Sequence, residues 1–381
     1  MPELIKVGFI GLSATGWGAQ YNGPALLDPS LKDRLKLTAV STTSPETAAA
    51  SAKMYGEKAG NEVKAYHGSS ARITADPDVD LVVVSVKTLL HKEVSIPVFE
   101  TGLKKRVFLE WPIGRGMSET LDVANAAKKH GFTPIVGLQA RCSGVVQKIK
   151  SLLDSGVIGR VISSRFIFVV PREARIWTPY ANVDNGRRYS LEKKNGATPL
   201  MIAGGHQLDA FMFALGQFTS ISASAAQIHP TLTLCNSTGT PTGETMASQF
   251  YDHYTFSGVL SSGVHATFIL QMGVSSVPGR KTLDWVIEGD KGMIQALSET
   301  TFGGCINLAS PNLYLNGEEV KVDGVKAGEW DAVGILVSQW AEVAKGSSGS
   351  CATIGDAIRL KEILEAVERS VDEGRTIKIN A

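Results

Sequence analysis

The chain opens with a short apolar run that ends in a glycine-containing turn. Apolar residues at positions 5, 7, 9 and 10 precede Gly11, Ser13 and Gly16, which occupy the three glycine positions of G-x-G-x-x-G. In that motif the first glycine permits a tight turn, the second lets backbone approach a pyrophosphate, and the third lets helix and strand pack closely. Ser13 departs from the pattern, because its Cβ holds the backbone farther away although its hydroxyl can bond a phosphate oxygen. The stretch predicts a strand that leads into a dinucleotide-binding turn, with an ordinary glycine-rich turn as the alternative.

The first 138 residues alternate between strand-like and helix-like segments. Residues 79–86 are nearly continuously apolar and β-branched, as expected for a parallel strand covered on both faces. Strands separated by helices imply right-handed crossovers and a doubly wound parallel sheet. We therefore predict a first domain over residues 1–138, with strands at 5–10, 35–41, 63–66, 79–86, 106–110 and 133–138 and helices at 44–55, 89–102 and 118–130.

The residues after the second strand bear on the choice of cofactor. Enzymes that use NAD usually place an acidic residue there to bind the ribose 2′-hydroxyl, and such a residue would repel a 2′-phosphate. This chain has Ser41, Thr42, Thr43 and Ser44 instead. Hydroxyl groups and the N–H groups at a helix start can donate to a phosphate. The run predicts NADP over NAD, and the alternative is a polar turn with a helix N-cap, since no arginine is present.

After residue 138 the pattern becomes rich in β-structure. We expect a second, α+β domain over residues 139–381, built on an open and mostly antiparallel sheet, because several runs alternate apolar and polar residues. The expected strands are 161–170, 220–228, 248–256, 264–272, 283–289, 293–297 and 375–379; the helices are 143–155, 199–215 and about 353–371; and the loops are 236–244 and 346–350. The helix at 353–371 has one apolar face and is assigned to packing on the body of the protein.

Composition limits the classes of function. A chain of 381 residues suggests two or three domains, and a formal charge of +1 gives no support for a nucleic-acid or anionic-membrane partner. The four cysteines lie far apart, with no spacing typical of a zinc site. No signal-peptide pattern and no apolar run of about 20 residues is present. We expect a soluble cytoplasmic protein without a metal site.

Four motifs in this order resemble the glucose–fructose oxidoreductase / inositol dehydrogenase / MocA (GFO/IDH/MocA) family. They are Gly11-x-Ser13-x-x-Gly16, Glu110-Trp111-Pro112, Gly205-His206-x-x-Asp209 and Gly355-Asp356-Ala357 with Ser370 and Gly374. Within the family the chain is most similar to the fungal branch that contains the repressor of the galactose regulon. The resemblance implies an N-terminal Rossmann domain, a C-terminal α/β domain with an open sheet, a cleft that holds nicotinamide and substrate, and a homo-oligomer formed through that sheet.

Two departures from the family pattern concern the chemistry. The family's Glu-Lys-Pro motif carries a lysine near the reacting carbonyl, and Trp111 takes its place here. An indole cannot deliver a proton in that role. The frequent Asp four residues before the catalytic histidine falls on Ile202. His206 remains as the candidate proton donor or acceptor, and the alternative is a buried helical histidine bonded to a neighbouring backbone group.

Other residues have a functional and a structural interpretation each. Lys87, Tyr180 and Tyr189 are candidate proton donors or merely structural groups. Arg141 is predicted to hold an anionic or hydroxylated substrate, or else to form a salt bridge between domains. Trp111 would form a stackable wall of the substrate pocket, and we expect Asp209 to cap or pair.

The predicted cofactor-binding residues follow the ends of the expected strands. They are Gly11, Leu12, Ser13, Thr15, Gly16, Trp17, Ser41, Thr42, Thr43, Ser44, Val86, His91, Glu110, Trp111, Pro112 and Gln139, with His91 also interpretable as helix-start structure. The favoured function is an NADP-dependent oxidoreductase acting on an alcohol or carbonyl of a sugar-like or other hydroxylated molecule. A catalytically silent dinucleotide-binding regulator with a protein partner, and a redox-neutral enzyme of the same fold, are the alternatives.

Overall fold

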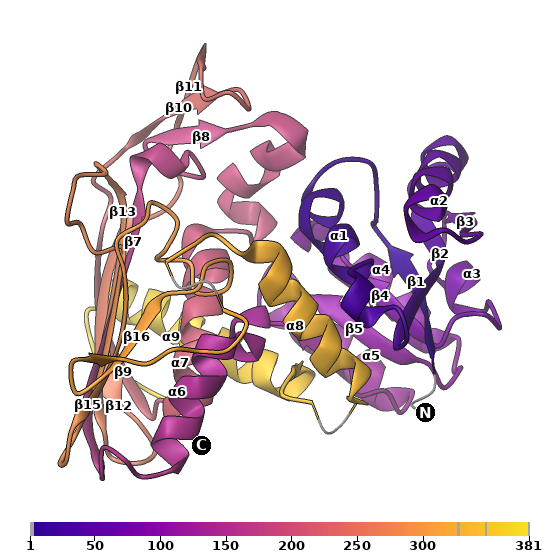
Figure 1. Ribbon diagram of the computed structural model, residues 1–381. Coiled ribbons are helices and arrows are strands. Elements are labelled where there is room, and N and C mark those ends of the chain that lie inside the picture. The colour runs from indigo at the N-terminus through magenta and orange to yellow at the C-terminus, as the bar shows by residue number, and fades with distance from the viewer. Residues whose placement is uncertain (1–3, 326–327, 347–348, 380–381) are drawn as a thin grey trace. The chain divides into compact units, whose positions relative to one another are not determined.

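The computed structural model describes residues 4–325, 328–346 and 349–379 and resolves into two compact units (Figure 1). The first unit comprises Met1–Gln139, Lys194–Gly196 and Leu336–Ile358, and the second comprises Ala140–Lys193, Ala197–Ile335 and Arg359–Ala381. Each unit therefore contains segments from distant parts of the chain. The division at residue 138 stays a prediction, and residues 336–358, which we assigned to the second domain, lie in the first unit.

A seven-stranded sheet forms the centre of the first unit. Its strands lie in the order β18-β6-β5-β4-β1-β2-β3, and all pairs except β18–β6 are parallel. The order reverses between β1 and β4, so the predicted doubly wound sheet is confirmed. The bounds are β1 Ile5–Ile10, β2 Leu35–Thr42, β3 Lys64–His67, β4 Leu81–Val84, β5 Arg106–Glu110, β6 Ile135–Gly137 and β18 Ala352–Thr353.

Helices of the first unit bury the apolar strands. The longer ones are α2 Pro45–Ala59, α4 His91–Glu100 and α5 Met117–Lys129, and the short ones are α1 Gly23–Leu26 and α3 Ala71–Thr74. Sequence analysis missed α8, Ala332–Ala344, whose Trp340 is fully buried. The indole ring of Trp340 lies 4.9 Å from the Phe108 ring and 6.4 Å from the Phe9 ring, measured between centroids. This contact holds α8 to the central strands β1 and β5.

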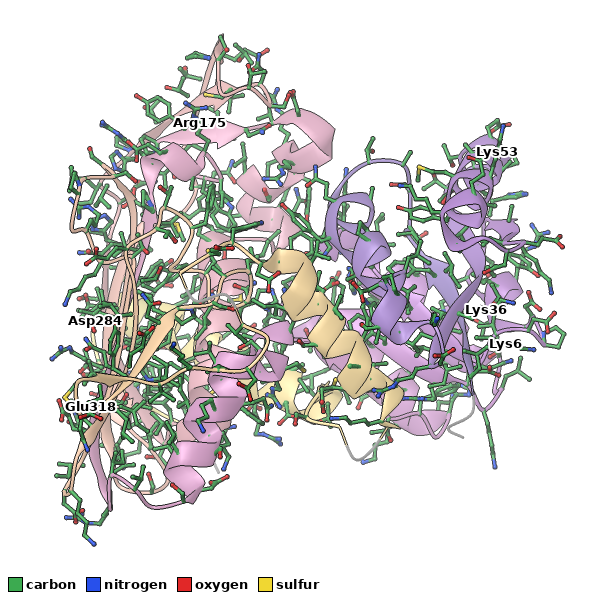
Figure 2. All side chains as sticks on the ribbon, viewed as in Figure 1. Lys6, Lys36, Lys53, Arg175, Asp284 and Glu318 are labelled. Atoms are coloured by element: carbon green, nitrogen blue, oxygen red, sulfur yellow. The ribbon has the colours of Figure 1, made fainter. Side chains whose placement is uncertain are left out.

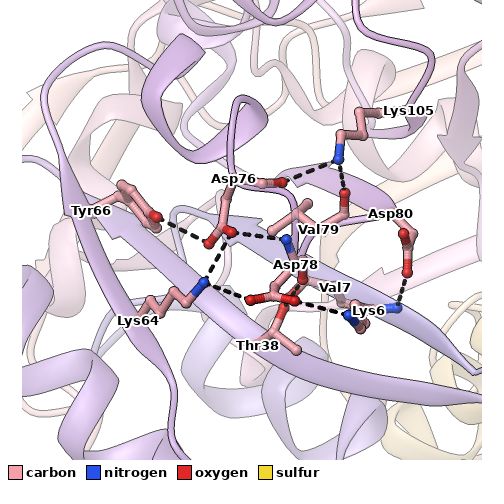
Figure 3. Close-up of polar contacts among 10 residues, drawn as sticks. All are labelled: Lys6, Val7, Thr38, Lys64, Tyr66, Asp76, Asp78, Val79, Asp80 and Lys105. Carbon is pink, nitrogen blue, oxygen red and sulfur yellow. Dashed lines mark hydrogen bonds and ion pairs between the residues drawn. The ribbon is translucent and has the colours of Figure 1, made fainter.

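Charged side chains form ion pairs with one another at the amino-terminal ends of the parallel strands (Figure 3). The Lys64 ammonium donates to Asp76 at 3.0 Å and to Asp78 at 2.8 Å, and the Lys6 ammonium donates to Asp78 at 2.9 Å. The Tyr66 hydroxyl donates to the other oxygen of Asp76 at 2.9 Å. We interpret this cluster as a structural brace, because its charges are paired within it.

The second unit is built on a nine-stranded sheet with the order β17-β16-β15-β14-β7-β13-β12-β9-β19. Only the β7–β13 pair is parallel, so the predicted mostly antiparallel sheet is confirmed. The bounds are β7 Val161–Pro171, β9 Ser220–Ala226, β12 His253–Val259, β13 His265–Val274, β14 Leu283–Gly289, β15 Met293–Ser298, β16 Asn312–Leu315, β17 Glu318–Glu319 and β19 Ile377–Lys378.

Helices α6 (Gly144–Asp154), α7 (Gly205–Leu215) and most of α9 (Ile354–Glu373) cover one face of this sheet (Figure 1). Beneath them the Phe166 and Phe268 rings stack with centroids 4.7 Å apart, and Phe211 of α7 meets Phe166 edge-on at 6.2 Å. The other face is more polar: Asp284, labelled in Figure 2, lies 3.6 Å from the guanidinium of Arg165. A homo-oligomer formed through this face stays a prediction.

Sequence analysis missed a three-stranded sheet, whose last strand begins within a predicted loop. Strands β8 (Tyr180–Asn182), β10 (Thr231–Cys235) and β11 (Pro241–Ala247) form it, so the predicted loop at 236–244 is wrong from residue 241 onward. The guanidinium of Arg175, labelled in Figure 2, donates to Thr238 O at 3.2 Å across the β10–β11 turn.

Some predicted bounds also change. The strand predicted at 248–256 begins only at residue 253, and α7 follows a π-helical turn, Leu200–Gly204. Part of the predicted loop at 346–350 lies outside the described residues. None of the helices in the described ranges combines the length and apolarity needed to cross a bilayer. The cytoplasmic location stays a prediction.

Candidate functional site

Two glycines in the turn after β1 have positive φ angles, which residues with a Cβ rarely adopt. Gly11 has φ +93°, and a Cβ there would lie 2.1 Å from Ser85 O. Gly16 has φ +86°, but nothing lies within 4 Å of its Cβ position. Gly11 is therefore required both by its φ angle and by close packing against the segment after β4, whereas only the φ angle favours glycine at position 16.

The turn presents donors that the protein leaves unused. Among the described residues the amides of Ala14, Thr15 and Gly16 have no acceptor, and the side chains of Ala14 and Thr15 are exposed. The Ser13 hydroxyl donates to Thr15 O at 2.7 Å and so stabilises the turn, while its oxygen can still accept. Successive free amides form a concave site for anions. These residues fit the diphosphate of a dinucleotide.

Helix α2 supports the turn from the protein side. The Ser51 hydroxyl donates to Leu12 O, and the Tyr55 hydroxyl donates to Ser13 O at 3.3 Å. Burial raises the pKa of Tyr55 to about 12, so the phenol keeps its proton and remains a donor. Sequence analysis missed both residues, although their i, i+4 spacing on α2 placed them on one helix face.

Some of the hydroxyl residues 41–44 after β2 have structural contacts, and others are exposed at the surface. Ser41 is buried, and its carbonyl accepts from the Gly11 amide at 2.9 Å. Ser44 caps α2 in a capping box with Thr47. The predicted N-cap at Ser44 is therefore confirmed, while the role of the run in cofactor choice stays a prediction. Thr43 is exposed, and its hydroxyl has no partner in the described part of the chain.

The residues after β4 are only partly exposed. His91 is 1% exposed, and its Nε2 lies 3.0 Å from Val86 O. Burial lowers the pKa of His91 to about 4, so a neutral ring donates to that carbonyl. This geometry supports the helix-start interpretation of His91. Lys87 is exposed.

Residues at the ends of β5 and β6 are buried. Glu110 accepts a hydrogen bond of 2.9 Å from the Asn22 amide, and burial raises the pKa of its carboxyl group to about 7. Trp111 is 5% exposed and precedes Pro112 through a cis peptide bond. The side-chain amide of Gln139 is fully buried, and neither of its polar atoms has a partner within the described ranges. Asn22, the partner of Glu110, was missed by sequence analysis.

His206 lies in the first turn of α7 in the second unit and is 6% exposed. Its Nδ1 has no hydrogen-bond partner in the described structure, which contradicts the backbone-bonded alternative. Burial lowers the pKa of His206 to about 3, so the imidazole is neutral near pH 7. A neutral imidazole can accept a proton from a hydroxyl group.

Arg141 and Asp209 form a buried ion pair inside the second unit. The Arg141 Nε donates to Asp209 Oδ2 at 2.9 Å, Nη2 donates to Oδ1, and the guanidinium lies 5.2 Å from the centroid of the Phe213 ring. The expected pairing of Asp209 is confirmed. The predicted salt bridge between domains is wrong, because both partners belong to one unit. A substrate role of Arg141 stays a prediction.

The two candidate tyrosines lie on separate elements. Tyr180 belongs to β8 and is 37% exposed, and Tyr189 belongs to the 3-10 helix Asp184–Leu191. Neither is hydrogen-bonded to His206 among the described residues. Their roles as proton donors stay predictions. The described residues contain no group of three His, Cys, Asp or Glu side chains that could hold a metal ion.

Comparison with known families assigns both parts of the chain. Residues 5–138 match the GFO_IDH_MocA model, described as an oxidoreductase family with an NAD-binding Rossmann fold, and residues 144–298 match the model of the Gal80p C-terminal domain. The chain therefore carries an N-terminal domain that matches the GFO_IDH_MocA model, followed by a domain that matches the Gal80p C-terminal model.

The chain is similar in sequence to both enzymes and regulators. Dehydrogenase aclE of Aspergillus oryzae is 29% identical over 98% of both chains. The galactose/lactose metabolism regulatory protein GAL80 of Saccharomyces cerevisiae is 26% identical over 82% of this chain and 70% of its own length. D-apiose dehydrogenase of Rhizobium rhizogenes is 22% identical over 86% of this chain and 87% of its own length.

Solved structures show the same fold. A super-repressor mutant of Gal80p from Saccharomyces cerevisiae superposes with a TM-score of 0.86 at 22% identity, covering 99% of this chain and 98% of that one. Levoglucosan dehydrogenase in complex with NADH and L-sorbose superposes with a TM-score of 0.74 at 18% identity, covering 99% of both chains. The fold is therefore shared by a repressor and by a dehydrogenase.

Proposed function

We propose that this protein is an NADP-dependent oxidoreductase that interconverts an alcohol and a carbonyl on a sugar-like or other hydroxylated small molecule. The observation that carries the proposal is the open turn at residues 11–16, where the three consecutive amides of Ala14, Thr15 and Gly16 lack acceptors in the described structure. Such a turn stabilises a bound diphosphate. Full-length similarity to a dehydrogenase supports the same function.

His206 is our candidate for the proton transfer. Oxidation of an alcohol breaks a C–H and an O–H bond and forms a C=O bond, so a hydride and a proton must both leave the substrate. The nicotinamide, when bound, supplies the hydride acceptor. Burial lowers the pKa of His206, so the ring is neutral and has a nitrogen that can accept the proton, while the same burial makes it a weaker base. Trp111 has no acidic proton for this step and serves in the proposal to shape the pocket.

Thr43 and Glu46 bear on the choice between NADP and NAD. The exposed hydroxyl of Thr43 can donate to a 2′-phosphate. Glu46, exposed in the first turn of α2, carries a carboxylate whose pKa is lowered by a hydrogen bond with the Ser44 side chain. That negative charge opposes a 2′-phosphate. We therefore expect Glu46→Gln to strengthen NADPH binding and leave NADH binding unchanged, as measured by titration calorimetry.

The second candidate function is a catalytically silent dinucleotide-binding regulator with a protein partner. Trp111 favours it, because the residue that replaces the family's lysine has no proton to deliver. The Gal80p-like C-terminal domain favours it as well. A redox-neutral reaction on the same fold remains the third alternative.

Two measurements separate these functions. NADPH should raise the melting temperature of the full chain, and the absorbance of reduced nicotinamide should change with at least one member of a panel of aldoses, ketoses and polyols. His206→Asn should lower turnover by about a hundredfold or more and leave NADPH affinity unchanged. The control is His265→Asn, which changes an exposed histidine on β13.

The outcomes are distinct. Stabilisation by NADPH without turnover on the whole panel would favour the regulator or the redox-neutral enzyme. Equal turnover by the His206 and His265 variants would refute the role of His206 while leaving the oxidoreductase function intact. A chain that binds neither NADPH nor NADH would contradict the entire proposal.

A further inference from the structure

A polar pocket lies at the surface of the second unit, among residues that the proposed function does not use. Its volume is about 280 Å³. Glu368 and Asp372, one turn apart on α9, line it together with Tyr254 of β12 and Lys193. The phenol ring of Tyr251 also lines it, with its centroid 5.9 Å from that of Tyr254.

Tyr254 presents an unused hydroxyl to this pocket. The side chain is 4% exposed, yet the hydroxyl has no hydrogen-bond partner among the residues that the structure describes. Burial, and after it the negative charges of Glu368 and Asp372, raise the pKa of Tyr254. Tyr254, Glu368 and Asp372 all line the same pocket. The hydroxyl oxygen is not among the fully buried unsatisfied atoms, so it is accessible to a ligand or to water in the pocket.

Glu368 is also without a hydrogen bond in the described structure. Burial raises the pKa of its carboxyl group, while the positive charge of Lys193 lowers it. No ion pair within 4 Å joins Glu368 to Lys193 in the described ranges, and the positive charge of Lys361 also lowers the pKa of Glu368. With two carboxylates and one ammonium, the lining carries an excess of negative charge.

The walls of the pocket are held in place by hydrogen bonds. The Gln227 side-chain amide donates to Ser248 O at 2.9 Å and to Phe250 O at 3.2 Å. The Lys193 backbone amide donates to Gln249 Oε1 at 2.9 Å. Because these bonds fix the loop before β12, the aromatic side chains are already positioned to receive a ligand.

We propose that this pocket binds an alkylammonium group. Two carboxylates offer charge-assisted hydrogen bonds to an ammonium, the Tyr254 hydroxyl offers a further acceptor, and phenol rings attract cations at their faces. An anion would meet the repulsion of Glu368 and Asp372. A neutral polyol would leave their charges uncompensated in a partly buried site. The ammonium comes either from a free diamine or from a lysine side chain of a partner protein.

The test is titration calorimetry of the full chain at constant ionic strength. The probes are 1,5-diaminopentane, Nα-acetyl-lysine-N-methylamide and galactitol. We expect the diamine to bind with a dissociation constant of about 1 mM or tighter. Glu368→Gln and Tyr254→Phe should each weaken binding by about tenfold, because each removes one polar partner and keeps the shape of the side chain. Glu362→Gln, on the exposed face of α9, is the matched control and should not change affinity.

Each outcome of the titration either supports or overturns the proposed alkylammonium site. Diamine binding without binding of the blocked lysine supports a free small cation, whereas binding of both supports a lysine side chain. Absence of heat with both ammonium probes overturns the proposal, as does binding of galactitol alone. Equal affinities of the Glu362 and Glu368 variants also overturn it. Circular dichroism and the melting temperature of each variant verify its fold independently of binding, and Tyr254→Phe remains a test if Glu368→Gln does not fold.

Discussion

Replacing Glu110 with glutamine tests how burial acts on a carboxyl group at the end of β5. The side chain is 8% exposed and accepts a hydrogen bond of 2.9 Å from the Asn22 amide. Desolvation is the largest influence and raises the pKa to about 7, against the hydrogen bonds from Asn22 and the Trp111 backbone. The Asn22 Oδ1 atom has no donor in the described structure. A protonated Glu110 carries the O–H donor that this environment lacks.

The sign and size of the effect follow from the two pKa values. Below about pH 4.5, the ordinary value, Glu110 is protonated in both folded and unfolded chains. Between 4.5 and about 7 the unfolded chain loses the proton and the folded chain keeps it, so the free energy of unfolding falls as pH rises. Above about 7 both states are ionised. The difference, at about 1.36 kcal/mol per pH unit, corresponds to about 3 kcal/mol lost across this window.

Urea unfolding from pH 4.5 to 8 measures this contribution. Glutamine cannot ionise, so Glu110→Gln should lack the Glu110 part of the pH dependence and should gain about 3 kcal/mol relative to the parent chain between the two ends of the range. Glu57→Gln, exposed on α2, is the control and should shift the stability equally at all pH values. A Glu110→Gln difference that stays constant from pH 4.5 to 8 would refute the reasoning.

Two further substitutions test packing. Asp209→Asn should cost about 3–5 kcal/mol in denaturant unfolding, because Arg141 would keep a buried charge without its partner; Glu244→Gln, in an exposed ion pair, should cost less than about 1 kcal/mol. Equal losses of stability in the Asp209 and Glu244 variants would contradict the assignment of Arg141 and Asp209 as a buried ion pair. Gly11→Ala should abolish stabilisation by NADPH, because its Cβ would lie 2.1 Å from Ser85 O. Undiminished NADPH affinity in that variant would show that the turn is not the binding site.

The sheet of the first unit was predictable because each strand has a recognisable local sequence pattern. Apolar β-branched runs and intervening helices fixed six strands to within a few residues. Helix α8 was missed for a physical reason: its sequence is apolar on nearly every side, so it has no 3.6-residue contrast between a buried and a polar face. Its place depends on Trp340 meeting Phe9 and Phe108, which lie more than 200 residues earlier.

The β10–β11 hairpin escaped prediction for the opposite reason. Strand β11 is exposed along almost its whole length, so no alternation of apolar and polar residues marks it. Its extended form comes from pairing with β10, for example Thr231 with Ala247. Composition alone makes such a segment look like a loop.

In the candidate site, some features depend on neighbouring residues in the sequence and others on residues that are distant along the chain. The sequence was sufficient for the φ-dependent glycine at Gly11 and the N-cap at Ser44, because neighbouring residues decide both. It identified Glu110 and Arg141 but not what they contact. Their partners lie 88 and 68 residues away along the chain, so only the fold brings them together.

Polar groups are paired at one end of the strands of the first sheet and unpaired at the other end. This contrast is the strongest argument for where a ligand binds. At the amino-terminal edge, Lys6, Lys64, Asp76 and Asp78 form ion pairs with one another (Figure 3). At the carboxyl edge, the amides of residues 14–16 and the Gln139 side chain lack partners in the described structure. A fold that pairs its polar groups at one edge and leaves backbone donors unpaired at the other has a site for an acceptor supplied from outside. The same logic explains why Ser13 can replace glycine: its hydroxyl turns back to Thr15 O and leaves the amides open.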